Sequence, residues 1–82
     1  MVKKRLNFGF AIKRLREEGG LSQTKLAELS KITQPMMSYI ESNKRIPSAQ
    51  IIGQIAQALG IVEQRIYDLA KENINYKEVA PS

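Results

Sequence analysis

The 82-residue sequence predicts an all-α fold, a compact five-helix bundle. Its apolar residues recur at intervals of three and four positions, as on the buried face of a helix. Residues with capping hydroxyls precede three of these segments, namely Ser22, Thr33 and Ser48. Glycines at which a helix can stop follow the first and the fourth of the helical segments, at Gly19-Gly20 and at Gly60. With 43% apolar residues, this length suits one folded domain with a small core.

The outer helices follow directly from this spacing. The first has an apolar face made of Phe8, Ala11, Ile12 and Leu15, and the pair Gly19-Gly20 ends it. A fourth helix runs from Ser48 to Leu59 and stops at Gly60, with inward residues Ile51, Ile52, Ile55, Ala56 and Leu59. Gly53 within it costs about 1 kcal/mol relative to alanine, so we expect close packing there. A fifth helix begins near Glu63.

Residues 1–70 are therefore expected to form the domain, and residues 71–82 a C-terminal tail. The helical periodicity is lost from Lys71 onward, and the sequence ends Ala80-Pro81-Ser82. We expect a frayed helix followed by disorder.

Residues 22–41 predict two short helices joined by a tight turn. Ser22 caps the first, which has a narrow apolar face of Leu26 and Ala27. Thr33 caps the second, with Pro35 in the first turn, where a missing N–H costs little. Its buried stripe is Met36, Met37 and Ile40. This is the layout of a helix-turn-helix, which would place its second helix, about residues 33–42, in the major groove of DNA.

The outward face of that second helix carries almost no charge. It consists of Gln34, Pro35, Ser38, Tyr39 and Ser42, whereas an ordinary solvated face is filled with Lys and Glu. A glutamine can donate to N7 and accept from N6 of adenine, a contact worth about 1–3 kcal/mol of discrimination. Gln34 is therefore the strongest base-reading candidate. The alternative is that Gln34 only caps the helix.

Seven landmarks between Phe8 and Leu69 resemble the Cro and lambda-type repressor family, the Xre-like helix-turn-helix regulators, in order and spacing. They are Leu15-Arg16, Leu21-Ser22-Gln23, Leu26-Ala27, Ile32-Thr33-Gln34, Ile40-Glu41, Pro47-Ser48 and Ala58-Leu59-Gly60-Ile61. The resemblance implies a lambda-repressor-like DNA-binding domain.

The resemblance also implies roles for single residues. Gln23 would bond a DNA phosphate and brace Gln34, which would read a base. Pro35, Ser38 and Tyr39 match positions that vary with the operator. Further DNA-backbone contacts are expected from Thr33, Asn43, Lys44 and Arg45. Arg16 and Glu41 match a structural ion pair, which would fix geometry more than it adds stability.

Three residues depart from the family pattern. Lys31 stands where the family has glycine in the turn, and a left-handed conformation there would cost about 1–2 kcal/mol. Either the turn is altered or the strain is tolerated. Asn43 replaces a helix-ending glycine, and asparagine suits that conformation next best. Pro35 removes an amide donor, although it can equally be a plain helix-start proline.

The charge is concentrated in the first half of the chain. Residues 1–45 carry a net charge of +6 and residues 46–82 a net charge of −1. Phosphate contacts would make affinity fall with salt. Candidates are Lys3, Lys4, Arg5, Lys13, Arg14, Lys25, Lys44 and Arg45, of which Lys44 and Arg45 follow the recognition helix directly.

The resemblance further implies a two-fold homodimer with recognition helices about 34 Å apart, one turn of DNA. The expected interface is the apolar surface of Ile61, Val62, Ile66 and Tyr67. The same surface supports an alternative function, a protein-interaction module such as an antitoxin or a coactivator-like partner. A pure interaction module would not need the neutral recognition face.

Enzymatic function is disfavoured. The sequence has no cysteine and no histidine, so disulfides, zinc sites and histidine-dependent catalysis are excluded or improbable. Glu17-Glu18 is the one adjacent acid pair and reads as surface charge. We expect no cofactor and no metal. The basic start lacks a long apolar run, so neither a secretory signal nor a membrane span is predicted, and we expect a cytoplasmic, nucleoid-associated protein.

Overall fold

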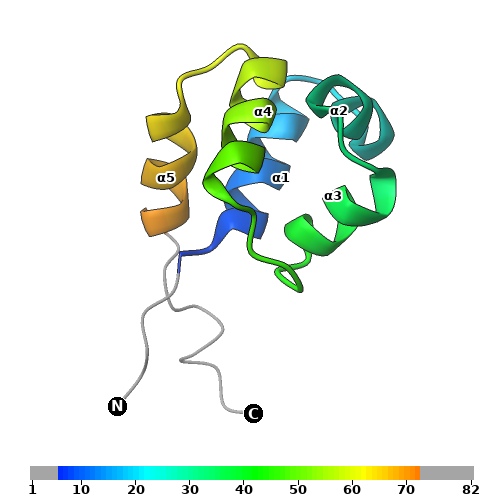
Figure 1. The fold of residues 1–82 in the computed structure, drawn as a ribbon. Helices are drawn as coiled ribbons and strands as arrows, with labels where there is room; N and C mark the ends of the chain where they lie inside the picture. The colour runs from blue at the N-terminus through cyan, green and yellow to red at the C-terminus, as the bar shows by residue number, and fades with distance from the viewer. Residues whose placement is uncertain (1–5, 73–82) are drawn as a thin grey trace.

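The structure, a computed structural model, describes residues 6–72 and contains five helices in that range (Figure 1). They are α1 (Phe8–Glu18), α2 (Gln23–Ser30), α3 (Gln34–Glu41), α4 (Ala49–Leu59) and α5 (Glu63–Glu72). Residues 6–72 form no strand, so the predicted all-α, five-helix architecture is confirmed.

Four helices begin at a residue whose side-chain oxygen accepts a backbone N–H of the first turn. The predicted caps Ser22, Thr33 and Ser48 accept from the amides of Lys25, Met36 and Ile51. Asn7, which the sequence did not single out, caps α1 in the same way through the amide of Phe10. Such caps satisfy donors that the helix itself leaves free.

One residue with a left-handed backbone follows each of the helices α1 to α4. These residues are Gly20, Lys31, Asn43 and Gly60, with φ between 62° and 72°. In all four turns the amide of the next residue donates to the carbonyl five positions earlier, as from Ile32 to Ala27 and from Lys44 to Tyr39. This bonding closes the helix end. The turn at Lys31 is therefore unaltered, and the lysine adopts the conformation that the sequence marked as strained.

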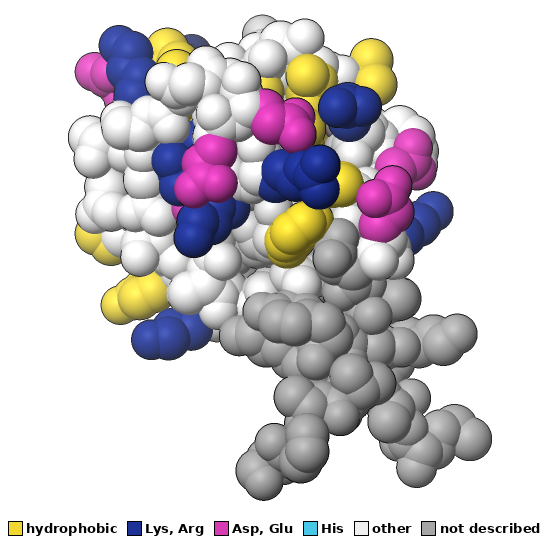
Figure 2. Space-filling view, turned by 180° about the vertical axis from the view of Figure 1, so that it is seen from behind, with side chains coloured by type: hydrophobic (Ala, Val, Ile, Leu, Met, Phe, Trp, Pro, Cys, Tyr) yellow, Lys and Arg dark blue, Asp and Glu magenta, His cyan; other side chains and the backbone are white. Residues whose placement is uncertain are grey.

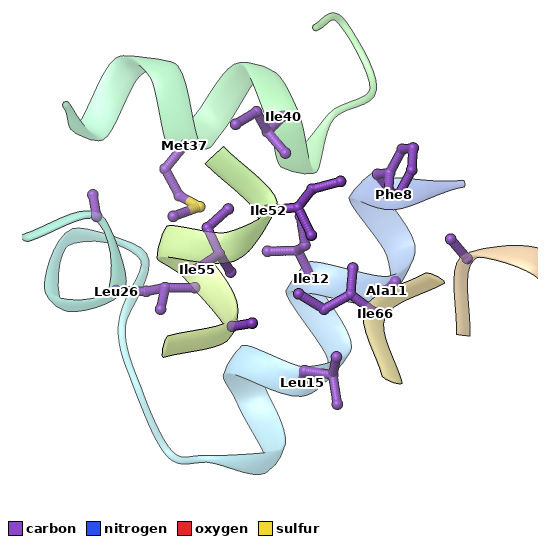
Figure 3. Packing of buried hydrophobic residues seen from close by; sticks show 13 residues of the cluster. Phe8, Ala11, Ile12, Leu15, Leu26, Met37, Ile40, Ile52, Ile55 and Ile66 are labelled. Carbon is purple, nitrogen blue, oxygen red and sulfur yellow. The ribbon is translucent and has the colours of Figure 1, made fainter. Parts of the chain in front are cut away.

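The helices surround one core (Figure 1). In that view α5 lies on one side of α4, α2 and α3 lie on the other, and α1 lies behind. The helix α1 packs against α3 and α5, and α2 packs against α3 and α4. Every helix contributes buried apolar side chains (Figure 3): Phe8, Ala11, Ile12, Leu15, Leu26, Ala27, Met37, Ile40, Ile52, Ile55, Ala56, Ile66 and Ala70. The orientation of α2 and α3 is thus set by a core that all five helices share.

Some predictions on the chain ends lie outside the described residues. This applies to Lys3, Lys4 and Arg5 and to residues 73–82, whereas Lys71 and Glu72 are the last residues of α5. None of the helices between residues 6 and 72 combines the length and apolar character needed to cross a membrane.

Candidate nucleic-acid interface

The two faces of α3 differ sharply in burial. Met37 and Ile40 are fully buried in the core, while Gln34 and Pro35 are exposed. Tyr39 is 51% exposed and Ser38 is half-buried. The predicted neutral face therefore lies at the surface, and it offers an amide, a hydroxyl and an aromatic ring to a partner.

The first residue of α3 is held by the first residue of α2. Gln34 donates its Nε2 to Oε1 of Gln23, and Gln23 donates its own Nε2 to Oε1 of Glu41 at 3.1 Å. The structure thus brings Gln23 and Gln34 together as the resemblance implied. The Gln23 bond to Glu41 was not expected from the sequence.

The Glu41 carboxylate also accepts hydrogen bonds from Arg16, so the predicted ion pair is present. Arg16 donates from Nε to Oε2 at 2.7 Å and from Nη2 to Oε1 at 3.0 Å, and its Nη1 bonds the carbonyl of Leu21 at 2.9 Å. The side chains are only 12% and 4% exposed. The hydrogen bond with Glu41 raises the pKa of Arg16, although burial alone would lower it. This contact ties α1 to the end of α3.

Asn43 was predicted to contact the DNA backbone, but the structure gives its side chain internal partners. Its Oδ1 accepts the amide of Gly9 at 3.0 Å, and its Nδ2 donates to Oδ1 of Asn7 at 2.7 Å. The Asn7 amide in turn donates to the carbonyl of Ala70 at 3.2 Å. We therefore treat Asn43 as a residue that anchors the end of α3 to α1.

Gly9 makes this anchoring sterically possible. A Cβ atom at Gly9 would lie 2.5 Å from the carbonyl oxygen of Glu41 and 2.9 Å from Nδ2 of Asn43. No such distance is tolerated between real atoms, so α1 and the end of α3 approach each other only because residue 9 has no side chain. In the sequence, the signal for this contact is a glycine within the first predicted helix.

The remaining backbone-contact candidates are at the surface. Lys44 and Arg45 are exposed and form no ion pair within residues 6–72, and both their amides donate to the carbonyl of Tyr39. Thr33 is exposed, and its hydroxyl oxygen accepts the Met36 amide. Ile46 follows Arg45 and is 64% exposed, an exposure that was not predicted from the sequence. By contrast, Arg14 and Lys25 pair with Glu18 and Glu28.

The residues predicted for the dimer surface differ in exposure. Val62 is 71% exposed, Ile61 is half-buried, and Tyr67 packs edge-on against Phe8 with ring centroids 5.6 Å apart. Ile66 is the exception, because it is fully buried in the core of its own chain and offers no surface to a second copy. Its inclusion in the interface was wrong.

A groove of about 480 Å³ lies beside Val62, between α1 and α5. Its lining mixes both signs of charge with apolar groups: Arg14, Glu18, Val62, Gln64, Arg65, Asp68, Leu69 and Glu72. The space-filling view from behind shows acidic, basic and hydrophobic side chains next to one another on this side of the molecule (Figure 2). Among residues 6–72, no group of His, Cys, Asp or Glu side chains could hold a metal ion.

Comparison of the sequence with known proteins gives one family. A family profile described as helix-turn-helix matches residues 12–63. An uncharacterized HTH-type transcriptional regulator of Mycobacterium tuberculosis is 37% identical over 59 residues, which make up 72% of this chain and 42% of that protein. The chain thus spans less than half the length of this relative.

Solved structures show the same fold. The restriction-modification controller protein C.AhdI from Aeromonas hydrophila is 32% identical, with a TM-score of 0.73 over 76% of this chain and 94% of that chain. The restriction-modification controller protein C.Esp1396I is 26% identical, with a TM-score of 0.71 over 79% and 84% of the two chains. The clp gene regulator ClgR from Corynebacterium glutamicum shares the fold at 22% identity, with a TM-score of 0.78 over 82% of this chain and 87% of that chain.

Proposed function

The chain belongs to the helix-turn-helix family of transcription regulators, of the Xre and Cro type, and we propose that it represses transcription by binding a palindromic operator as a homodimer. The observation that carries this proposal is the exposed neutral face of α3, with Gln34 held in place by Gln23. The family consists of DNA-binding regulators and not of enzymes.

In the proposed complex, α3 lies in the major groove. Gln34 reads a base edge, and Pro35, Ser38 and Tyr39 contribute further contacts that depend on the sequence. Lys44 and Arg45 bind phosphates beyond the end of α3. Gln23 at the start of α2 and Thr33 at the start of α3 bind further phosphates. Because Asn43 is engaged by Asn7 and Gly9, it supports the loop that carries the two basic residues.

Selection of bound fragments from a genomic library tests this proposal. The affinities for the recovered site and for random DNA are then compared at two salt concentrations. We expect a palindrome that is bound far more tightly than random DNA, with an affinity that falls steeply with salt. Uniformly weak, salt-sensitive binding would instead favour a protein partner for the surface around Val62. Transcription in vitro from a promoter that contains the site tests repression.

Two substitutions separate base reading from phosphate binding. Gln34→Ala should weaken binding at one operator base pair by about 1–3 kcal/mol while leaving random DNA unaffected. Lys44→Ala should weaken binding on every sequence and lower the salt dependence by about one phosphate contact. Equal effects of Gln34→Ala on the operator and on random DNA would contradict the proposed base contact.

For the dimer we propose a surface of Ile61, Val62 and Tyr67, continued by the groove between α1 and α5. A two-fold contact places each residue near the same surface of the other copy, so Arg65 of one chain can face the acidic residues Asp68 and Glu72 of its partner. Val62→Asp should lower the sedimentation coefficient and the operator affinity together without unfolding the chain, because Val62 is exposed. Leu29→Asp is a matched control on the exposed side of α2. Equal sedimentation of the two variants would misplace the interface.

A further inference from the structure

The hydrogen bonds that lead from Glu41 to Gln34 all point the same way. Gln23 donates to the Glu41 carboxylate at 3.1 Å, and Gln34 donates to the oxygen of Gln23. Arg16 donates two further bonds to the same carboxylate, one to Oε2 and one to the Oε1 that Gln23 also bonds. This series of hydrogen bonds therefore runs from Glu41 at the end of α3, through Gln23 at the start of α2, to Gln34 at the start of α3.

The direction of these bonds follows from the chemistry of the carboxylate. An ionised carboxylate only accepts hydrogen bonds, whereas an amide can either donate or accept. Gln23 must therefore turn its NH₂ group toward Glu41, which leaves its oxygen for Gln34. Gln34 must in turn give that oxygen an N–H. Because the Glu41 side chain is only 4% exposed, water has little access to satisfy it instead.

One acceptor and one donor of Gln34 remain free, its oxygen and its second N–H. Adenine presents a matching pair in the major groove, the N6 donor and the N7 acceptor, while guanine presents two acceptors, N7 and O6. Taking the proposed DNA contact of Gln34 as a premise, we propose that Glu41 is a positioning residue: its carboxylate fixes the orientation of the Gln34 amide and thereby makes Gln34 select adenine over guanine.

Glu41→Gln provides the direct test, since it keeps the shape and replaces an obligatory acceptor by an amide. The new amide can turn its oxygen to Nε of Arg16 and its NH₂ to Gln23, and it then loses the bond that Nη2 of Arg16 makes to the oxygen shared with Gln23. Gln23 would then present its NH₂ to Gln34, and Gln34 would show its own NH₂, two donors, to the groove. This arrangement fits the two acceptors of guanine.

The measurement uses the full chain and duplexes of the selected operator. The relevant base pair is the one at which Gln34→Ala abolishes discrimination, and it is supplied as A·T and as G·C. We expect Glu41→Gln to reduce the ratio of A·T to G·C affinity at this pair by at least about fivefold, and to leave the ratios at other positions unchanged. Phosphate contacts cancel in such ratios, and a general loosening of the fold would lower all of them together.

Glu17→Gln is the matched control. Glu17 also approaches Arg16, at 4.0 Å, but it is 58% exposed and has no bond to Gln23. It should leave the ratio unchanged. If Glu41→Gln keeps the wild-type ratio, or if Glu17→Gln lowers it equally, the proposal is overturned.

Gln23→Met covers the case in which Glu41→Gln does not fold. It removes the link to Gln34 and leaves the bonds between Arg16 and Glu41 intact, and it should reduce the same ratio to a similar extent without inverting it. An unchanged ratio in Gln23→Met overturns the positioning role alone. A wild-type chain that discriminates at no base pair overturns the proposed function itself.

Discussion

The helices α3 and α5 are held to the rest of the domain by different kinds of contact. Directional polar bonds fix both ends of α3, through Gln34 at its start and through Glu41 and Asn43 at its end. The helix α5 is held mainly by apolar burial of Ile66 and Ala70, with one backbone hydrogen bond from Asn7. Its ion pair from Arg65 to Glu18 is exposed and 4.0 Å long.

This difference matches what each helix has to do in the proposed function. Hydrogen bonds constrain angles as well as distances, whereas hydrophobic burial depends mainly on the area removed from water. A helix that reads base edges has to be placed to within about 0.5 Å. A helix that offers an apolar surface to a second copy tolerates small shifts. Substitutions in α5 should therefore affect stability, and substitutions in the polar contacts of α3 should affect geometry first.

The largest expected effect comes from Ile66→Ala. Ile66 is fully buried, so its truncation should lower the free energy of unfolding by about 2–5 kcal/mol. Urea denaturation measures this loss, and the base preference of the fraction that stays folded should be unchanged. Val62→Ala, at an exposed residue directly before α5, is the control and should change stability by less than about 0.5 kcal/mol. A loss below about 1 kcal/mol in Ile66→Ala would refute apolar anchoring of α5.

The sequence predicted the helices because their signals are local. Caps such as Ser22 and Thr33 and the stops at Gly20 and Gly60 act within a few residues of where they stand. The assignment of Ile66 failed because Val62 and Ile66 stand four residues apart, a spacing that would place them on one face of a continuous helix. The helix α5 begins only at Glu63, so Val62 lies before it and stays exposed, while Ile66 lies on its buried face with Ala70.

The polar contacts of α3 were only partly predictable for a different reason. Gln23 and Gln34, and Arg16 and Glu41, were expected only because the chain resembles a known family. The bonds of Asn43 with Asn7 and Gly9 join residues 36 and 34 positions apart and carry no periodic signal. Such contacts depend on how the helices dock, which local propensity does not specify.

The contact between α1 and the end of α3 depends on a close approach at Gly9. Gly9→Ala should destabilise the domain by about 1–3 kcal/mol, because its Cβ would overlap the backbone carbonyl of Glu41. Gly53→Ala is a matched control within a helix. Its Cβ would meet only the carboxylate tip of Glu63, at 3.0 Å, and that flexible side chain can move away. Thermal unfolding should therefore show Gly53→Ala unchanged or stabilised by up to about 1 kcal/mol.

If both alanine variants lose the same stability, the close approach at Gly9 is not a special feature of the α1 and α3 contact. Such a result would also support the close packing expected at Gly53, where the structure places only the end of the Glu63 side chain near a new Cβ atom.

The smallest predicted effect compares two left-handed residues, Lys31 and Asn43, both with φ of 62°. Lys31→Gly should stabilise the domain by about 0.5–1 kcal/mol, since it relieves strain at some cost in unfolded-state entropy. Asn43→Gly relieves less strain and removes the bonds to Asn7 and Gly9, so it should destabilise by about 1 kcal/mol. Chemical denaturation of both variants would show opposite signs. Stabilisation by both would mean that Asn43 serves only the turn, and that the end of α3 is fixed by Glu41 without it.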